Sequence, residues 1–176
     1  MNLDIEKVPV LLNVNIRNLV FDLRAHYELS KRYGTLQKLV EEIKRESTES
    51  MPLILQIGFA HEEDVPIDEL GLLVDMSNIK YLTVQTIRAL MNSLPDPNKY
   101  AKNQIKQPSA DEDIGWDWDR LYYMGTVLFG MSEAVFWRTL PRKLFALSAA
   151  HKEYHNPKED GQADAGTTPS WVNDYI

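Results

Sequence analysis

The sequence predicts a mainly α-helical protein, built from a small helical N-terminal domain and a short helical C-terminal extension. Three observations carry this prediction. Apolar residues recur at helical spacing through residues 1–94, a proline-rich polar linker follows at 95–113, and an aromatic-rich extension covers 114–155. Residues 156–176 are interpreted as a flexible, disordered tail that ends in an apolar motif. The 176 residues include no cysteine, so the core has to rest on apolar packing without disulfides.

The first long helix is expected to begin near residue 16 and to end at Gly34, with Thr35 as the N-cap of a second helix. Five residues share one helical face in the first of these: Ile16, Leu19, Val20, Leu23 and Tyr27. The second helix repeats the spacing with four aliphatic residues: Leu36, Leu39, Val40 and Ile43. Val8–Val14 is short and uniformly apolar, so a short N-terminal strand stays open as an alternative there.

Proline positions divide the rest of the N-terminal domain into shorter helices. Pro52 suits the first turn of a third helix, and Pro66, followed by two acidic residues, opens a fourth. Asn78 is expected to cap the last helix, which Pro95 stops. The domain is therefore predicted to be a succession of short helices around one apolar core.

The extension is predicted to hold three short helices. The first should end at Gly130, Ser132 should cap the second, and Pro141 should begin the third. The apolar face of the third helix is assigned to three residues: Leu144, Leu147 and Ala150. Helices this short cannot easily bury all the aromatic side chains of the extension among themselves.

Charge is distributed in blocks. Residues 1–98 carry 15 acidic and 10 basic residues, residues 99–109 carry three lysines and no acid, and residues 110–176 carry 11 acidic and 6 basic residues, so −5, +3 and −5 give the net charge of −7. An acidic chain without clustered Lys and Arg is a poor nucleic-acid binder. Its longest apolar stretch, Met51–Ala60, has about half the length that a membrane span needs. We therefore expect neither nucleic acid nor membrane as a partner.

No motif in the sequence indicates catalysis, a cofactor or a metal. His151 and His155 have helical i, i+4 spacing, but Lys152 occupies the place of the glutamate that zinc proteases use, and no third ligand is evident. His26 and His61 stand beside acidic residues and are interpreted as surface polar residues. Glycines are scattered singly, without a phosphate-binding loop. The sequence therefore predicts a protein that is not an enzyme.

The aromatic residues of the extension leave two interpretations open, a compact core and a protein-binding face. Trp, Tyr and Arg dominate binding hot spots, which favours the second. Trp171 belongs to a short apolar motif that follows the tail, with no obvious core to join. The candidate partner-binding residues are Trp116, Trp118, Phe136, Trp137, Pro141, Arg142, Leu144 and Trp171.

Two parts of the chain resemble the tail assembly chaperones of long-tailed bacteriophages and related prophages. In the extension, Met131–Leu144 carries Met-Ser, Phe-Trp and Pro-Arg followed by a leucine helix, and Ala-His at 150–151 closes the pattern. In the N-terminal domain, Phe21–Leu36 and Met51–Leu73 look like the first and second helix pairs of that family. One position departs from the pattern, because Leu140 stands where the family usually has threonine before Pro141.

The resemblance implies a non-enzymatic chaperone that keeps the long tape measure protein soluble during tail assembly. It further implies contact with the tail tube subunit, self-association of the N-terminal domain, and a longer product made by translational frameshifting. Such a protein would act in the cytoplasm of the bacterial host and would be absent from the mature virion.

Two other classes remain as alternatives. The helices around 116–151 could form a helix-turn-helix of a small DNA-binding regulator, although their surroundings are acidic and few Lys or Arg residues are available there. A small hydrolase or metal enzyme built on His151 and His155 ranks lower still, because no nucleophile with an activating partner accompanies them.

Overall fold

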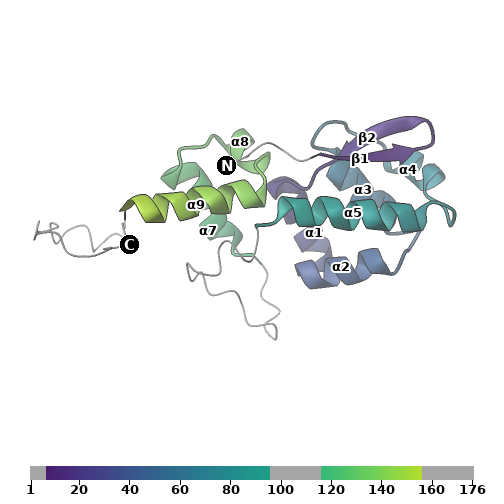
Figure 1. The fold of residues 1–176 in the computed structure, drawn as a ribbon, viewed down its shortest axis with the longest axis horizontal. Coiled ribbons are helices and arrows are strands. Elements are labelled where there is room, and N and C mark those ends of the chain that lie inside the picture. The colour runs from purple at the N-terminus through teal and green to yellow at the C-terminus, as the bar shows by residue number, and fades with distance from the viewer. Residues whose placement is uncertain (1–6, 96–115, 156–176) are drawn as a thin grey trace, which may run out of the picture.

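The computed structural model describes residues 7–95 and 116–155 (Figure 1). Of these residues, 64% are helical and 8% form two short antiparallel strands, which confirms the mainly α fold class. The N-terminal part contains the strands β1 (Val8–Leu12) and β2 (Asn15–Leu19) and the helices α1 (Leu23–Tyr33), α2 (Leu36–Lys44), α3 (Met51–Phe59), α4 (Ile67–Leu73) and α5 (Ile79–Ser93). The C-terminal part contains α7 (Trp118–Tyr123), the π-helical turn η1 (Met124–Leu128), α8 (Glu133–Trp137) and α9 (Pro141–His155).

The two strands form a hairpin in which Leu12 pairs with Asn15 and Val8 pairs with Leu19. Asn13 stands in the turn with a φ of 55°, a left-handed conformation that asparagine tolerates better than most residues. Residues of β1 alternate between buried and exposed, so a strand forms where the sequence left the choice open. The predicted helix over residues 16–22 is wrong, because Asn15–Leu19 pairs with β1 and the first helix begins only at Leu23.

The ends of α1 and α2 follow the sequence prediction. Gly34 closes α1 with a φ of 80°, and the Thr35 side chain accepts a hydrogen bond from the backbone amide of Lys38 at the start of α2. The sequence did not suggest the N-cap of α1, which is Asp22. Its carboxylate accepts a hydrogen bond from the Ala25 amide at 2.9 Å.

The hairpin and α1 to α5 enclose the larger of two apolar cores. Fully buried members include Phe21, Leu55, Phe59, Leu82 and Leu90. Gly58 lets α3 approach the end of β2, since a β-carbon there would lie 2.5 Å from the Leu19 side chain. Asn78 precedes α5 as predicted, but its side chain does not cap that helix and instead bonds back to Leu73 and Asp75.

The C-terminal helices also begin and end near the predicted residues. Gly130 has a φ of 64°, where the chain leaves η1, the Ser132 side chain caps α8, and Pro141 begins α9. The predicted face of α9 is correct for Leu144 but wrong for Ala150, which is exposed. The Thr139 hydroxyl, two residues before α9, donates a hydrogen bond back to the Val135 carbonyl of α8 at 2.7 Å.

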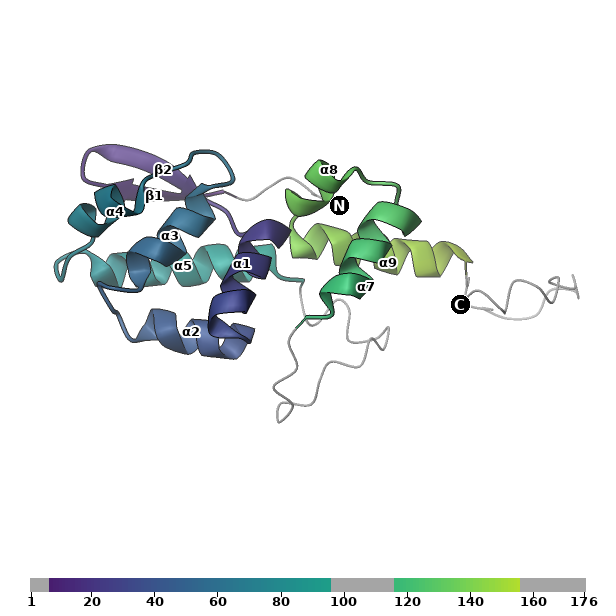
Figure 2. The same cartoon turned by 180° about the vertical axis from the view of Figure 1, so that it is seen from behind.

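The second core joins the C-terminal helices to the N-terminal part. Its fully or largely buried members are Leu121, Phe136 and Leu144, together with Leu23 from the first turn of α1. In both views α7, α8 and α9 lie together beside α1, on the side away from the hairpin (Figure 1 and Figure 2). The short extension therefore completes its core with a residue of the N-terminal part.

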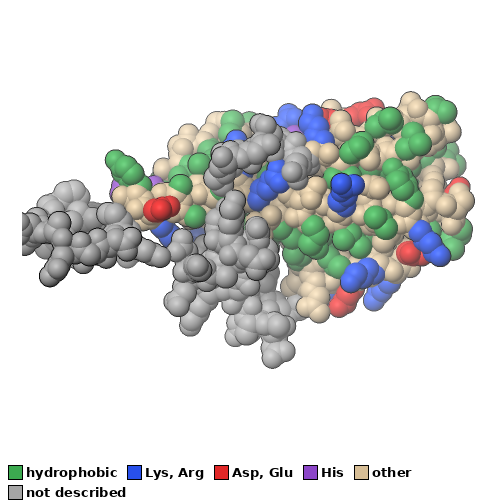
Figure 3. Space-filling model, in the orientation of Figure 1, with side chains coloured by type: hydrophobic (Ala, Val, Ile, Leu, Met, Phe, Trp, Pro, Cys, Tyr) green, Lys and Arg blue, Asp and Glu red, His purple; other side chains and the backbone are tan. Residues whose placement is uncertain are grey.

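Some hydrophobic side chains stay on the surface, and Figure 3 shows several of them over the N-terminal part. Within residues 7–95 and 116–155, no helix combines the length and the hydropathy that a membrane crossing requires.

Candidate functional site

The first two turns of α1 meet the C-terminal helices in a contact that we call the α1 seam, made by residues 23–28 with 116–118 and 134–139. Its backbone link is a hydrogen bond from the Leu23 amide to the Thr139 carbonyl at 2.9 Å. A second link joins the same group of helices to the loop after α3, where the Arg138 guanidinium donates to the His61 carbonyl at 2.5 Å. These bonds fix α8 against the N-terminal part.

Aromatic rings line the α1 seam. The Trp116 ring stacks on His26 with 4.9 Å between ring centroids and 17° between planes. Tyr27 lies 5.2 Å from both Trp118 and Trp137, and the Lys31 ammonium sits 4.0 Å above its ring. Such contacts contribute beyond the burial of area alone, by about 0.5–1.5 kcal/mol per aromatic pair.

A buried polar network stands behind these rings. The Asp22 carboxylate uses one oxygen to cap α1 and the other to contact His61 Nδ1 at 2.8 Å, with both side chains only 7% exposed. His26 Nε2 contacts the Ser93 hydroxyl at 2.8 Å, which ties α1 to the end of α5. His26 and His61 are therefore structural residues, and their interpretation as surface polar residues is wrong.

The Ser93–His26 pair has the spacing of a nucleophile and its base, but its arrangement differs from that of a catalytic pair. Ser93 is 2% exposed, and its hydroxyl donates to the Leu90 carbonyl at 2.6 Å. The proton that a base would remove is thus bonded to a backbone carbonyl, and His26 is 5% exposed. The pair therefore links two helices, with both side chains buried.

Burial lowers the pKa of His26 from its ordinary 6.5 to about 4, and the negative charge of Asp22 opposes this shift only in part. The unfolded chain therefore binds a proton on this ring between pH 6.5 and 4 while the folded protein does not. The stability that the protein gains by keeping His26 neutral is fully present above pH 6.5 and is lost as the pH falls to 4. We expect the loss to be about 3 kcal/mol in the free energy of unfolding.

This pH dependence can be measured by urea unfolding of the wild type and His26→Gln at pH 7 and pH 4. The wild type should lose about 3 kcal/mol more than His26→Gln over this interval. His155→Gln, which changes an exposed histidine, serves as the control and should follow the wild type. Parallel losses in the wild type and His26→Gln would show that His26 is not held neutral by burial.

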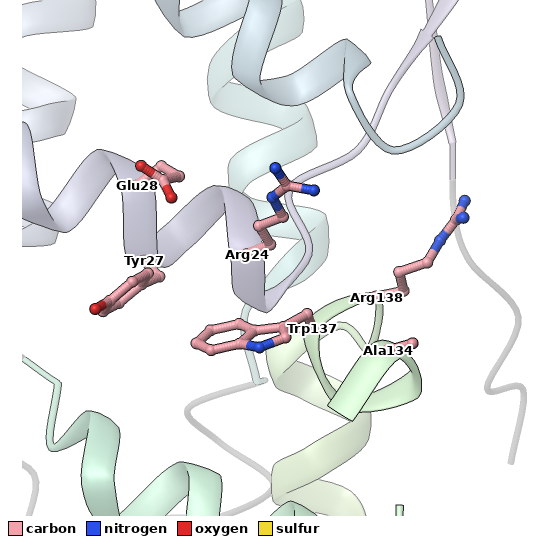
Figure 4. Close-up of a pocket in the computed structure, with 6 residues that line it drawn as sticks. All are labelled: Arg24, Tyr27, Glu28, Ala134, Trp137 and Arg138. Carbon is pink, nitrogen blue, oxygen red and sulfur yellow. The ribbon is translucent and has the colours of Figure 1, made fainter. Parts of the chain in front are cut away.

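A pocket of about 410 Å³ opens on the surface of the α1 seam (Figure 4). Arg24, Tyr27 and Glu28 line it from α1, and Ala134, Trp137 and Arg138 line it from α8 and the residue after it. The ring of Trp137 lies between the two helices. Trp, Tyr and Arg are the residue types that contribute most to protein–protein binding, so the pocket has the lining composition of a protein-binding surface.

The structure distributes the eight candidate partner-binding residues over three environments. Phe136, Pro141 and Leu144 are buried, and a partner could reach them only if the helices separated. Trp116, Trp118, Trp137 and Arg142 are half-buried, and only Trp137 of these lines the pocket. Trp171 lies outside the described residues. The aromatic cluster thus combines a core with an accessible edge: Phe136 belongs to a compact core, and a protein-binding face at the half-buried tryptophans stays a prediction.

Sequence reasoning missed the α1 side of the pocket. Arg24, Tyr27 and Glu28 lie in the predicted first helix, and nothing near them in the sequence indicates a contact with residues more than one hundred positions further on. The one usable signal was the excess of aromatic residues in the extension, which required another apolar surface to cover them.

His151 and His155 lie with 4.2 Å between ring centroids, and Phe129 packs against His151 at 5.9 Å. Across the part of the chain that the structure describes, no three histidine, aspartate or glutamate residues converge as metal ligands would.

Searches against family models, curated proteins and solved structures found no match to this chain.

Proposed function

We propose that this protein is a non-enzymatic tail assembly chaperone, which binds the tape measure protein in the cytoplasm of a bacterial host and does not remain in the mature virion. The proposal is supported most by the pocket at the α1 seam, where two arginines accompany Tyr27 and Trp137. Its viral context comes from the resemblance of 131–151 and of the N-terminal helices to that family.

The physical properties of the chain fit this role. A long helical protein exposes apolar faces until its assembly partners cover them, and exposed apolar faces aggregate. An acidic carrier of net charge −7 would keep such a complex dispersed by repulsion between copies. The tail tube subunit and a second copy of this chain are further proposed partners, and nucleic acid, membrane and metal are not.

The proposal is tested with purified full-length protein and overlapping fragments of a candidate tape measure protein from the same genome. We expect at least one fragment to bind. Arg24→Glu should weaken this binding about tenfold, which corresponds to about 1.4 kcal/mol, because it reverses an exposed pocket charge.

Arg120→Glu provides the matched control, since it makes the same charge change at an exposed position of α7 outside the pocket. Binding by this variant should equal that of the wild type. If no tape measure fragment binds the wild type, the proposed function is wrong. If fragments bind the wild type and Arg24→Glu equally, the pocket is not the binding site.

A further inference from the structure

The outer face of α5 carries an apolar ridge that the fold leaves uncovered. Tyr81, Val84 and Met91 follow helical spacing along it and are 40%, 61% and 48% exposed. Leu11 of β1, 53% exposed, extends the ridge, because its amide donates to the Tyr81 hydroxyl at 3.0 Å. We call these four residues with Arg88 the α5 stripe.

The charges of α5 distinguish its surface from the rest of the protein. The helix contains Lys80 and Arg88, both exposed, and no acidic residue. In the described part of the chain, neither cation takes part in an ion pair. Figure 3 shows this side of the molecule, with hydrophobic side chains lying between separate Lys and Arg side chains. A chain of net charge −7 therefore presents one apolar face whose own helix is purely cationic.

We propose that the α5 stripe is the docking surface for an acidic amphipathic helix of the partner protein. This inference rests on the proposed function in taking the partner to be helical. A ridge at 3.6-residue spacing packs into the grooves of another helix, and the distance from Tyr81 to Met91 corresponds to about 15 Å, or roughly three turns. Acidic residues beside the partner's apolar stripe would meet Lys80 and Arg88.

The charge pattern also supplies specificity. The other large exposed apolar residues of the N-terminal part include Ile67, Leu72 and Met76, which stand among the acids Asp68, Glu69 and Asp75. An acidic helix would be repelled there and attracted at the α5 stripe, whereas a basic helix would have the opposite preference. The α5 stripe therefore selects its partner by the sign of the partner's charge.

The test uses the full chain and two labelled synthetic peptides of about 18 residues, or five helical turns, measured by fluorescence anisotropy. Both peptides have leucine at helical spacing, and one has glutamate where the other has lysine. We expect the glutamate peptide to bind at the stripe and the lysine peptide to bind at the acidic surface around Ile67, Leu72 and Met76. Val84→Glu and Arg88→Glu should each weaken binding of the glutamate peptide about tenfold, whereas Arg120→Glu, outside the stripe, should not. Arg88→Glu should not weaken binding of the lysine peptide.

Three results would overturn the inference. The first is an Arg88→Glu variant that loses affinity for both peptides equally, and the second is glutamate-peptide binding that neither stripe variant weakens. The third is a wild-type protein that self-associates in sedimentation velocity and becomes monomeric as Val84→Glu, because the stripe would then be occupied by a second copy. Glutamate-peptide binding at the stripe without any tape measure binding would contradict the proposed function alone. Circular dichroism of both variants establishes that they fold.

Discussion

Replacing Phe136 with alanine is expected to lower the free energy of unfolding by about 3–5 kcal/mol. Phe136 is fully buried at the centre of the second core, where its ring contacts Tyr122 at 5.3 Å and Trp137 at 4.9 Å between centroids. The backbone of Gly125 presses against it so closely that a β-carbon there would lie 2.3 Å from the ring. Because η1 and α8 are already in contact, neither element can easily move into the cavity that the alanine substitution would leave.

Urea unfolding followed by tryptophan fluorescence measures this loss. Val135→Ala is the natural control, because the neighbouring side chain is 54% exposed and its truncation should change stability by no more than about 0.5 kcal/mol. A loss below about 1 kcal/mol for Phe136→Ala would mean that the second core is loosely packed, and that Phe136 is available to a partner as the sequence suggested.

The second large effect is expected at Asp22. Asp22→Ala removes the cap of α1, worth about 1 kcal/mol, and leaves His61, whose side chain is 7% exposed, without its carboxylate partner. We expect a total loss of about 2–4 kcal/mol at pH 7, because the cap and the buried hydrogen bond between Asp22 and His61 are lost together.

The two roles of Asp22 can be separated with Asp22→Asn, whose side-chain oxygen can still accept from the Ala25 amide but carries no charge for His61. The free energy of unfolding of Asp22→Asn should therefore lie between those of the wild type and Asp22→Ala. Asp119→Ala removes an exposed acid from the first turn of α7 and should cost no more than about 0.5 kcal/mol. Equal stability of Asp22→Ala and Asp119→Ala would show that the buried network contributes nothing.

Local chemistry made most of the helices predictable. Gly34, Thr35 and Ser132 mark helix ends through interactions with residues no more than four positions away, and such signals are fully written in a short stretch of sequence. The second strand of the hairpin escaped prediction because Ile16 and Leu19 satisfy helical spacing by coincidence. Ile16 is in fact 71% exposed, and only the pairing with β1 decides the conformation of that segment.

The candidate site was predictable on one side only. The aromatic excess of the extension identified Trp116, Trp118 and Trp137, but their contacts with His26 and Tyr27 depend on how two distant segments pack. Buried polar residues were hidden in the same way, because Asp22 and His61 look like surface residues until the fold brings them together. Periodicity predicts which face of a helix is apolar, but it does not predict which other helix will pack against that face.

Leu23 of α1 belongs to the second core, so the extension covers an apolar surface of the N-terminal part. In a shorter product of this chain, ending before Trp116, the first turns of α1 would lose their cover, and Leu23, His26 and Tyr27 would face water. The extension acts as an internal shield for this face, in the same way that an external protein would. A chain with the extension and a chain without it would therefore differ in the exposed apolar surface of α1, because the same residues would be buried in one and exposed in the other.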